Sequence, residues 1–128
     1  MKVMNLLVSV TLLIALSSCE GGTTFTKTIE NKSSEEISFK MFTIYGSNNS
    51  YVINPNESKE VYWDDQMGAF VDASYSCTLE IDSVQLTISN GRILKKDIMD
   101  DENWIRISKD GRNSREDCIF IIVDEDLQ

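Results

Sequence analysis

The sequence predicts an all-β fold, a small antiparallel β-sandwich of about seven or eight strands, with a small β-barrel as the alternative. Two observations predict this class. Short stretches of alternating apolar and polar residues recur along the chain, and turn-forming residues separate them at intervals of about 8 to 12 residues. Only one short polar stretch, residues 95–104, has room for a helix, and the chain of 128 residues accommodates one domain.

The first half of the domain contains four stretches that we expect to form strands, two of them alternating and two of them short apolar runs. Polar loops and turns separate them. In the turn at residues 54–57, Pro55 occupies the second position, where its fixed φ angle suits a β-turn. The four stretches are residues 24–29, 37–43, 51–53 and 61–63.

The clearest local pattern in the second half is a β-hairpin over residues 83–96. Apolar and polar residues alternate up to Ser89, Asn90-Gly91 supplies the positive φ angles of a tight two-residue turn, and residues 92–96 run back. A further strand or two is expected over residues 69–79, before this hairpin.

The last third of the chain predicts two more strands. Residues 104–108 alternate and are short, and residues 109–117 form a polar loop. Residues 118–123 are an almost unbroken apolar run, which predicts a central strand buried on both faces.

The N-terminal residues predict a secretory signal. Lys2 gives a positive start, residues 3–16 are almost entirely apolar, and small residues follow. The apolar run is about 14 residues long, whereas a transmembrane helix needs about 20, so we expect a cleaved signal rather than a membrane span.

Leu16-Ser17-Ser18-Cys19 resembles the lipobox of bacterial lipoproteins. In that family the cysteine thiol is alkylated with diacylglycerol, the chain is cut just before the cysteine, and the new amine is acylated. The resemblance implies lipidation of Cys19 and a location in the cell envelope. We expect the outer membrane, with its periplasmic face and its surface face as the two alternatives. It divides the chain into a signal peptide (1–18), a lipidated tether (19–23) and a single β-sandwich domain (24–128).

Composition excludes several classes of function. Twenty-one acidic and 12 basic side chains give a net charge of −9, which is unsuited to nucleic acid. The chain has no histidine, which removes Ser-His-Asp and Cys-His catalysis and most zinc sites. The acidic clusters at residues 64–65, 97–102 and 124–126 lack the spacing of a calcium loop. We therefore predict no enzymatic activity, no cofactor and no metal.

Two cysteines remain once Cys19 is lipidated. In an oxidising compartment Cys77 and Cys118 are expected to form one disulfide, and two buried free thiols are the alternative. On the chain-entropy model, closing this loop stabilises the fold by about 4 kcal/mol.

Three aromatic residues are candidates for stacking on a sugar ring: Tyr62, Trp63 and Trp104. Tyr62 and Trp63 are neighbours on a predicted strand, so they point to opposite faces. One can fill the core while the other is exposed. The alternative reading places each of them in the core.

The C-terminal half of the chain carries a series of strand and turn motifs. These motifs are Asp82-Ser83-Val84, the strand to Ser89, Asn90-Gly91-Arg92, Asn103 and the run from Phe120 to Asp126, and the turn from Ile53 to Ser58 precedes them. With these motifs the chain resembles the small envelope lipoproteins of Bacteroidota, most of which have no known function. This resemblance implies an immunoglobulin-like sandwich and supplies no activity.

The sequence as a whole predicts a membrane-anchored, non-catalytic module for protein interaction or envelope assembly. A glycan-binding module of the cell envelope is the alternative. The expected partners are the membrane, through the N-terminal lipid, and an envelope protein or glycan.

Overall fold

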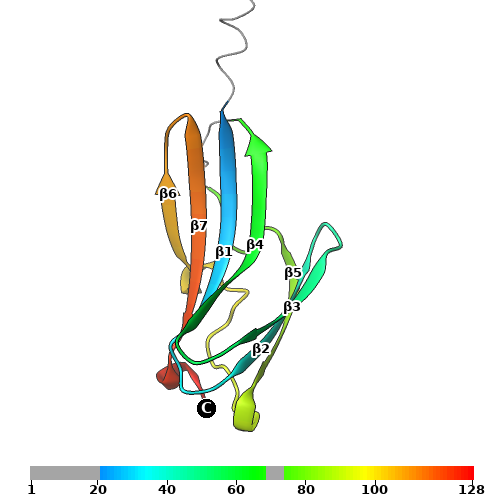
Figure 1. The fold of residues 1–128 in the computed structure, drawn as a ribbon, viewed down its shortest axis with the longest axis vertical. Helices are drawn as coiled ribbons and strands as arrows, with labels where there is room; N and C mark the ends of the chain where they lie inside the picture. Colours follow the sequence, from blue (N-terminus) through cyan, green and yellow to red (C-terminus); the bar gives the residue numbers. More distant parts are fainter. Residues whose placement is uncertain (1–20, 69–73) are drawn as a thin grey trace, which may run out of the picture.

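The computed structural model describes residues 21–68 and 74–128 and shows two β-sheets packed face to face (Figure 1). The first sheet has four strands in the order β4-β1-β7-β6, and the second has three in the order β3-β2-β5. The strands are β1 (Gly22–Asn31), β2 (Ile37–Thr43), β3 (Asn48–Ile53), β4 (Glu57–Met67), β5 (Ile81–Ile88), β6 (Ile105–Lys109) and β7 (Asn113–Ile122).

The predicted all-β sandwich is confirmed, and the barrel alternative is wrong because the two sheets do not close on each other. One pair departs from the antiparallel expectation, since β1 and β7 run parallel at the centre of the first sheet. The sandwich architecture is that of immunoglobulin domains, but the order of the strands differs, because β1 lies between β4 and β7.

The predicted hairpin over residues 83–96 is wrong beyond its turn, whose two central residues do take positive φ angles. β5 pairs with β2 instead. Residues 92–98 cross toward the first sheet, where Leu94 forms a bridge with Leu127 and Ile98 is buried. A strand returning beside β5 would have carried these apolar side chains away from the core, and the crossing buries them.

Three further predictions need correction. β7 is central as expected, but only one of its faces is buried, and Ile119 and Ile121 on the other face are half-exposed. β7 also begins at Asn113, inside the stretch expected to be a loop. Residues 74–79, expected to be strand, form turns instead; residues 69–73 of that prediction lie outside the described residues.

The interior has two ends that differ in chemistry. At one end, which we call the apolar end, side chains from the two sheets face each other. The buried residues there are Ile29, Ile37, Phe39, Ile53, Phe120 and Ile122. Each is almost fully removed from water, so this end has the packed core expected of a sandwich.

The other end, which we call the polar end, lies where the first sheet extends beyond the second (Figure 1). Residues 74–80, the cover segment, lie over the inner face of the first sheet at this end and are joined to β7 by the Cys77–Cys118 disulfide. The side chains buried there are largely polar: Thr23, Lys27, Glu80, Ser114 and Glu116.

Candidate functional site

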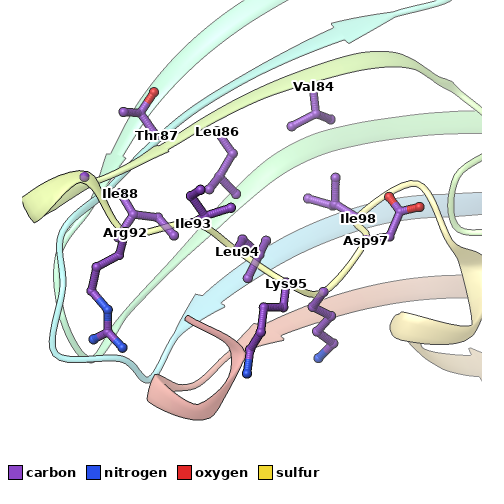
Figure 2. Close-up of a pocket in the computed structure, with 12 residues that line it drawn as sticks. Val84, Leu86, Thr87, Ile88, Arg92, Ile93, Leu94, Lys95, Asp97 and Ile98 are labelled. Carbon is purple, nitrogen blue, oxygen red and sulfur yellow. The ribbon is translucent and has the colours of Figure 1, made fainter. Parts of the chain in front are cut away.

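A groove of about 550 Å³ lies on the described surface between β5 and the crossing segment, residues 92–98 (Figure 2). Val84 and Leu86 lie on the β5 side of it, and Leu94 and Ile98 lie across from them. The full lining is Val84, Leu86, Thr87, Ile88, Gly91, Arg92, Ile93, Leu94, Lys95, Lys96, Asp97 and Ile98.

The groove exists because β5 is an edge strand. It pairs with β2 on one side and has no strand neighbour on the other among the described residues. Val84 and Leu86 face the interior but stay half-buried, since no strand covers them from the open side. Ile88 is buried at the closed end of the groove, next to the Ser89–Gly91 turn.

The far wall of the groove is anchored to the rest of the fold. The backbone of Ile93 exchanges two hydrogen bonds with Gln128, at 3.0 and 2.9 Å. The indole of Trp104 donates to the Ile98 carbonyl at 2.8 Å. The groove is therefore a preformed feature with two fixed walls.

Basic side chains are concentrated along this wall. Arg92, Lys95 and Lys96 line the groove with Asp97 as the one acidic member, although acidic residues exceed basic ones in the whole chain. Lys96 donates to the Ile121 carbonyl at 2.8 Å and lies over the ring of Phe120. The groove thus combines an apolar floor with a locally positive rim.

A second hollow, of about 390 Å³, contains exposed aromatic residues. Trp63 is 59% exposed and Tyr45 is 67% exposed, and both line it beside Tyr62. Ser47, Asp64 and Gln66 supply polar groups around these rings. We call this the aromatic hollow.

Tyr62 packs against the core and Trp63 is exposed, as expected if one of the two turns inward, and both rings border the aromatic hollow. Tyr62 is half-buried, with the Lys27 ammonium 5.1 Å from its ring centre. Burial, and then the charge of Glu80, raise the pKa of Tyr62. Its phenol therefore stays protonated and able to donate a hydrogen bond across the physiological pH range.

Trp104 lies apart from the aromatic hollow. It is only 6% exposed and packs against Phe120 in the core, with its indole N–H bonded to Ile98. The predicted stacking set therefore divides, and burial leaves Trp104 without a face for a ligand. The third aromatic residue of the hollow is Tyr45, which the sequence analysis did not select. Its position directly before Gly46, in a surface turn, is the sequence feature that could have indicated its exposure.

Cys77 and Cys118 are joined by a disulfide across 41 residues, as expected. Both are buried, one on the cover segment and one on β7. Cys19, the predicted lipidation site, lies outside the described residues.

The polar end contains a buried ionic network that the sequence analysis did not find. The Lys27 ammonium lies 2.6 Å from a Glu80 oxygen and 3.0 Å from the Tyr75 hydroxyl, which itself bonds Glu80. Beside it, Arg106 makes two hydrogen bonds to Glu116, at 2.8 and 2.9 Å. The sequence feature that could have indicated this network is Lys27, a charged residue at an inward position between the apolar Phe25 and Ile29.

The electrostatics of this network follow from burial. Burial lowers the pKa of Lys27, and the hydrogen bond and charge of Glu80 offset this only in part. Burial alone would raise the pKa of Glu116, but hydrogen bonds from Arg106 and Ser108 outweigh it and hold that pKa below its usual value. Every buried side-chain polar atom of the described residues has a partner, so the network is closed rather than directed at a ligand.

Two further structural findings concern metals and membranes. Within residues 21–68 and 74–128, no cluster of three or more Cys, Asp or Glu side chains is placed to hold a metal ion. In the same two ranges, no helix is long and apolar enough to cross a bilayer.

Comparison with protein-family models, with curated proteins and with solved structures finds no match to this chain. We therefore infer the function from the geometry of the molecule.

Proposed function

We propose that this protein is a lipid-anchored envelope protein whose sandwich binds a partner protein in the groove beside β5. The groove is the observation that supports this best. It is preformed, apolar at its floor and bounded by a strand edge with which no other described strand pairs, which are properties of a protein-binding surface.

The position of the groove fits an anchor at the N-terminus. β1 starts at Gly22, only three residues after Cys19, so a lipid on that cysteine would hold the start of β1 close to the membrane. The Ser89–Gly91 turn at the end of the groove lies at the opposite end of the molecule from the start of β1 (Figure 1). Anchoring would therefore leave the groove turned away from the membrane and open to partners.

The anchor is tested by metabolic labelling with an alkyne-bearing fatty acid. We expect the full chain to carry the label and to sediment with membranes. The Cys19→Ser variant should carry no label and should leave the membrane fraction, because one residue supplies the only attachment point in this proposal. Equal labelling of both proteins would contradict lipidation at Cys19.

Protein binding is tested by site-specific photo-cross-linking in intact cells. Ile93, 63% exposed at the groove, and Ile107, 43% exposed on β6, are each replaced by p-benzoylphenylalanine in the full chain. We expect a cross-linked product of defined mass from position 93 and none of that mass from position 107. The same products from both positions would show that contacts are not specific to the groove.

Glycan binding is the second candidate, and the aromatic hollow favours it. Exposed Trp63 and Tyr45 offer ring faces for stacking, and Asp64 and Gln66 offer hydrogen bonds to sugar hydroxyls. We expect a glycan array to register ligands that the Trp63→Ala variant loses. Retention of all signals by that variant would exclude the hollow as the sugar site.

A further inference from the structure

We propose that the groove receives an extended peptide segment, which adds as a strand between β5 and the crossing segment. This inference rests on the proposed function and specifies the partner that the groove would take. Its ligand is a stretch of polypeptide with apolar side chains at alternate positions and acidic residues between or beside them. Four observations carry it, two from backbone geometry, one from side chains and one from charge.

The first observation is the free edge of β5. In antiparallel pairing, residues alternate between pairs that exchange backbone hydrogen bonds and pairs that do not. The N–H of Ser89 donates to the Glu36 carbonyl, which places the neighbouring pair of Ile88 and Ile37 in the second class. By the same alternation, the N–H and C=O groups of Leu86 and Val84 point away from β2 and toward the groove.

The second observation is a matching edge on the far wall. Ile93 exchanges both of its backbone bonds with Gln128, so the next residue, Leu94, directs its N–H and C=O away from the C-terminal tail. That direction is the side of the groove (Figure 2). An inserted strand would thus find backbone partners on both walls, as strand-addition ligands require.

The third observation is the row of apolar side chains on each wall. Val84 and Leu86 are two residues apart on β5, so they face the same side of the strand. Leu94 and Ile98 stand opposite them. A strand with apolar side chains at every second position would direct those side chains between the two rows and remove Val84 and Leu86 from water.

The fourth observation decides the charge of the occupant. Three basic side chains and one acidic one line the groove; Arg92 lies 4.0 Å from the Glu35 carboxylate, so the net positive charge of the rim comes from Lys95 and Lys96 against Asp97, in a chain with 21 acidic and 12 basic residues. Acidic residues on the peptide would therefore be attracted to this rim and repelled elsewhere on the surface. A second copy of the chain is a poorer occupant, because two chains with a net charge of −9 repel each other.

The test uses the full chain and a short synthetic peptide in which valine alternates with glutamate, read by hydrogen–deuterium exchange. We expect the peptide to slow exchange in the segments that contain Val84, Leu86 and Leu94. A matched peptide, N-methylated at alternate backbone amides, keeps every side chain but loses the donors. It should bind at least about tenfold more weakly, because each lost hydrogen bond contributes to affinity.

Two variants locate the site. Leu86→Glu places a charge on the groove floor and should weaken binding at least about tenfold. Gln85→Glu adds the same charge to the adjacent residue of β5, which points to the other face of the sheet, and should leave binding within about twofold. A lysine-for-glutamate version of the peptide should bind more weakly than the acidic one.

Each other outcome overturns this inference in a distinguishable way. Equal binding of the N-methylated peptide would show an apolar site without strand addition. Slowed exchange in β5 that depends on protein concentration, without peptide, would assign the groove to a second copy. If no peptide binds while position 93 still cross-links to a defined protein, the strand ligand is wrong and the proposed function stands.

Discussion

The two ends of the sandwich interior are closed by different means. At the apolar end, two sheets face each other, and Ile29 and Phe120 of the first sheet share one hydrophobic cluster with Ile37 and Ile53 of the second. At the polar end no strand of residues 21–68 and 74–128 lies opposite the first sheet, and the cover segment takes that place with a disulfide and a network of buried charges. Hydrophobic burial therefore dominates one end, and covalent and ionic contacts dominate the other.

This difference shows how a small sandwich tolerates sheets of unequal length. An irregular segment cannot offer an alternating apolar face, so its contacts with the first sheet are fixed at particular atoms. Tyr75 is an example: its ring packs on Phe25, its hydroxyl accepts a hydrogen bond from Lys27, and its carbonyl accepts one from Arg106. Mutations at the two ends should accordingly act by different mechanisms.

The largest effect is expected from breaking the buried ion pair. Lys27→Met leaves the Glu80 carboxylate buried beside an apolar side chain and should lower the free energy of unfolding by about 3–5 kcal/mol. Urea denaturation measures this. The double variant Lys27→Met/Glu80→Leu should recover most of the loss, and a double variant as unstable as the single one would show that packing, not charge, is responsible.

A similar loss by another mechanism is expected at the apolar end. Phe120 is fully buried, so Phe120→Ala removes its contacts and leaves a cavity, at a cost of about 3–5 kcal/mol. Removing a charged residue elsewhere should not recover the free energy of unfolding lost in Phe120→Ala. Recovery by the Glu80→Leu change would contradict the separation of the two ends.

Removing the disulfide should act on the polar end by a smaller amount. Cys77→Ala/Cys118→Ala is expected to lower the free energy of global unfolding by about 2–4 kcal/mol, and in the folded state it also releases the cover segment from β7, so that this segment opens locally. In hydrogen exchange, the cover segment and β7 should lose protection before β2 and β3. Uniform loss across both sheets would argue against a local role.

The pH dependence gives a finer test of the polar end. Because the pKa of Glu116 is lower in the folded chain than in the unfolded one, its contribution to stability is complete above the unfolded value, about 4.3. That contribution is lost as the pH falls through the folded pKa. Glu116→Gln should therefore reduce the fall in the free energy of unfolding at acid pH. An unchanged fall would show that other carboxylates cause the loss of stability in acid.

The smallest effect on stability is expected at the aromatic hollow. Trp63 is exposed, so Trp63→Ala should change the free energy of unfolding by less than about 0.5 kcal/mol. Thermal unfolding measures this. A larger loss would show that Trp63 supports the fold and would weaken its assignment as a stacking residue.

Sequence patterns predicted the fold class well where burial follows simple alternation. β2 was located at its true position, and the disulfide followed from the number of cysteines and the expected compartment. Only half of β7 was predicted, because its first inward residues, Ser114 and Glu116, are polar and have partners on the neighbouring strands β1 and β6 of the same sheet. A pattern based on hydrophobicity does not recognise an inward carboxylate whose cation lies on another strand.

The groove could not be predicted for a related reason. The Asn-Gly turn indicated a hairpin, and a hairpin would have filled the edge of β5. Whether a chain returns beside its own strand or crosses to the other sheet depends on long-range contacts, here those of Leu94 and Ile98. Local turn chemistry was correct, but the partner of β5 was a property of the whole fold.

The most direct test of the central claim is the affinity of the protein cross-linked from position 93 for two variants of the full chain. We predict that Leu86→Glu, on the groove floor, lowers that affinity at least about tenfold, while Gln85→Glu, on the opposite face of β5, leaves it unchanged. Equal affinities for the two variants would contradict the groove as the binding site of this protein.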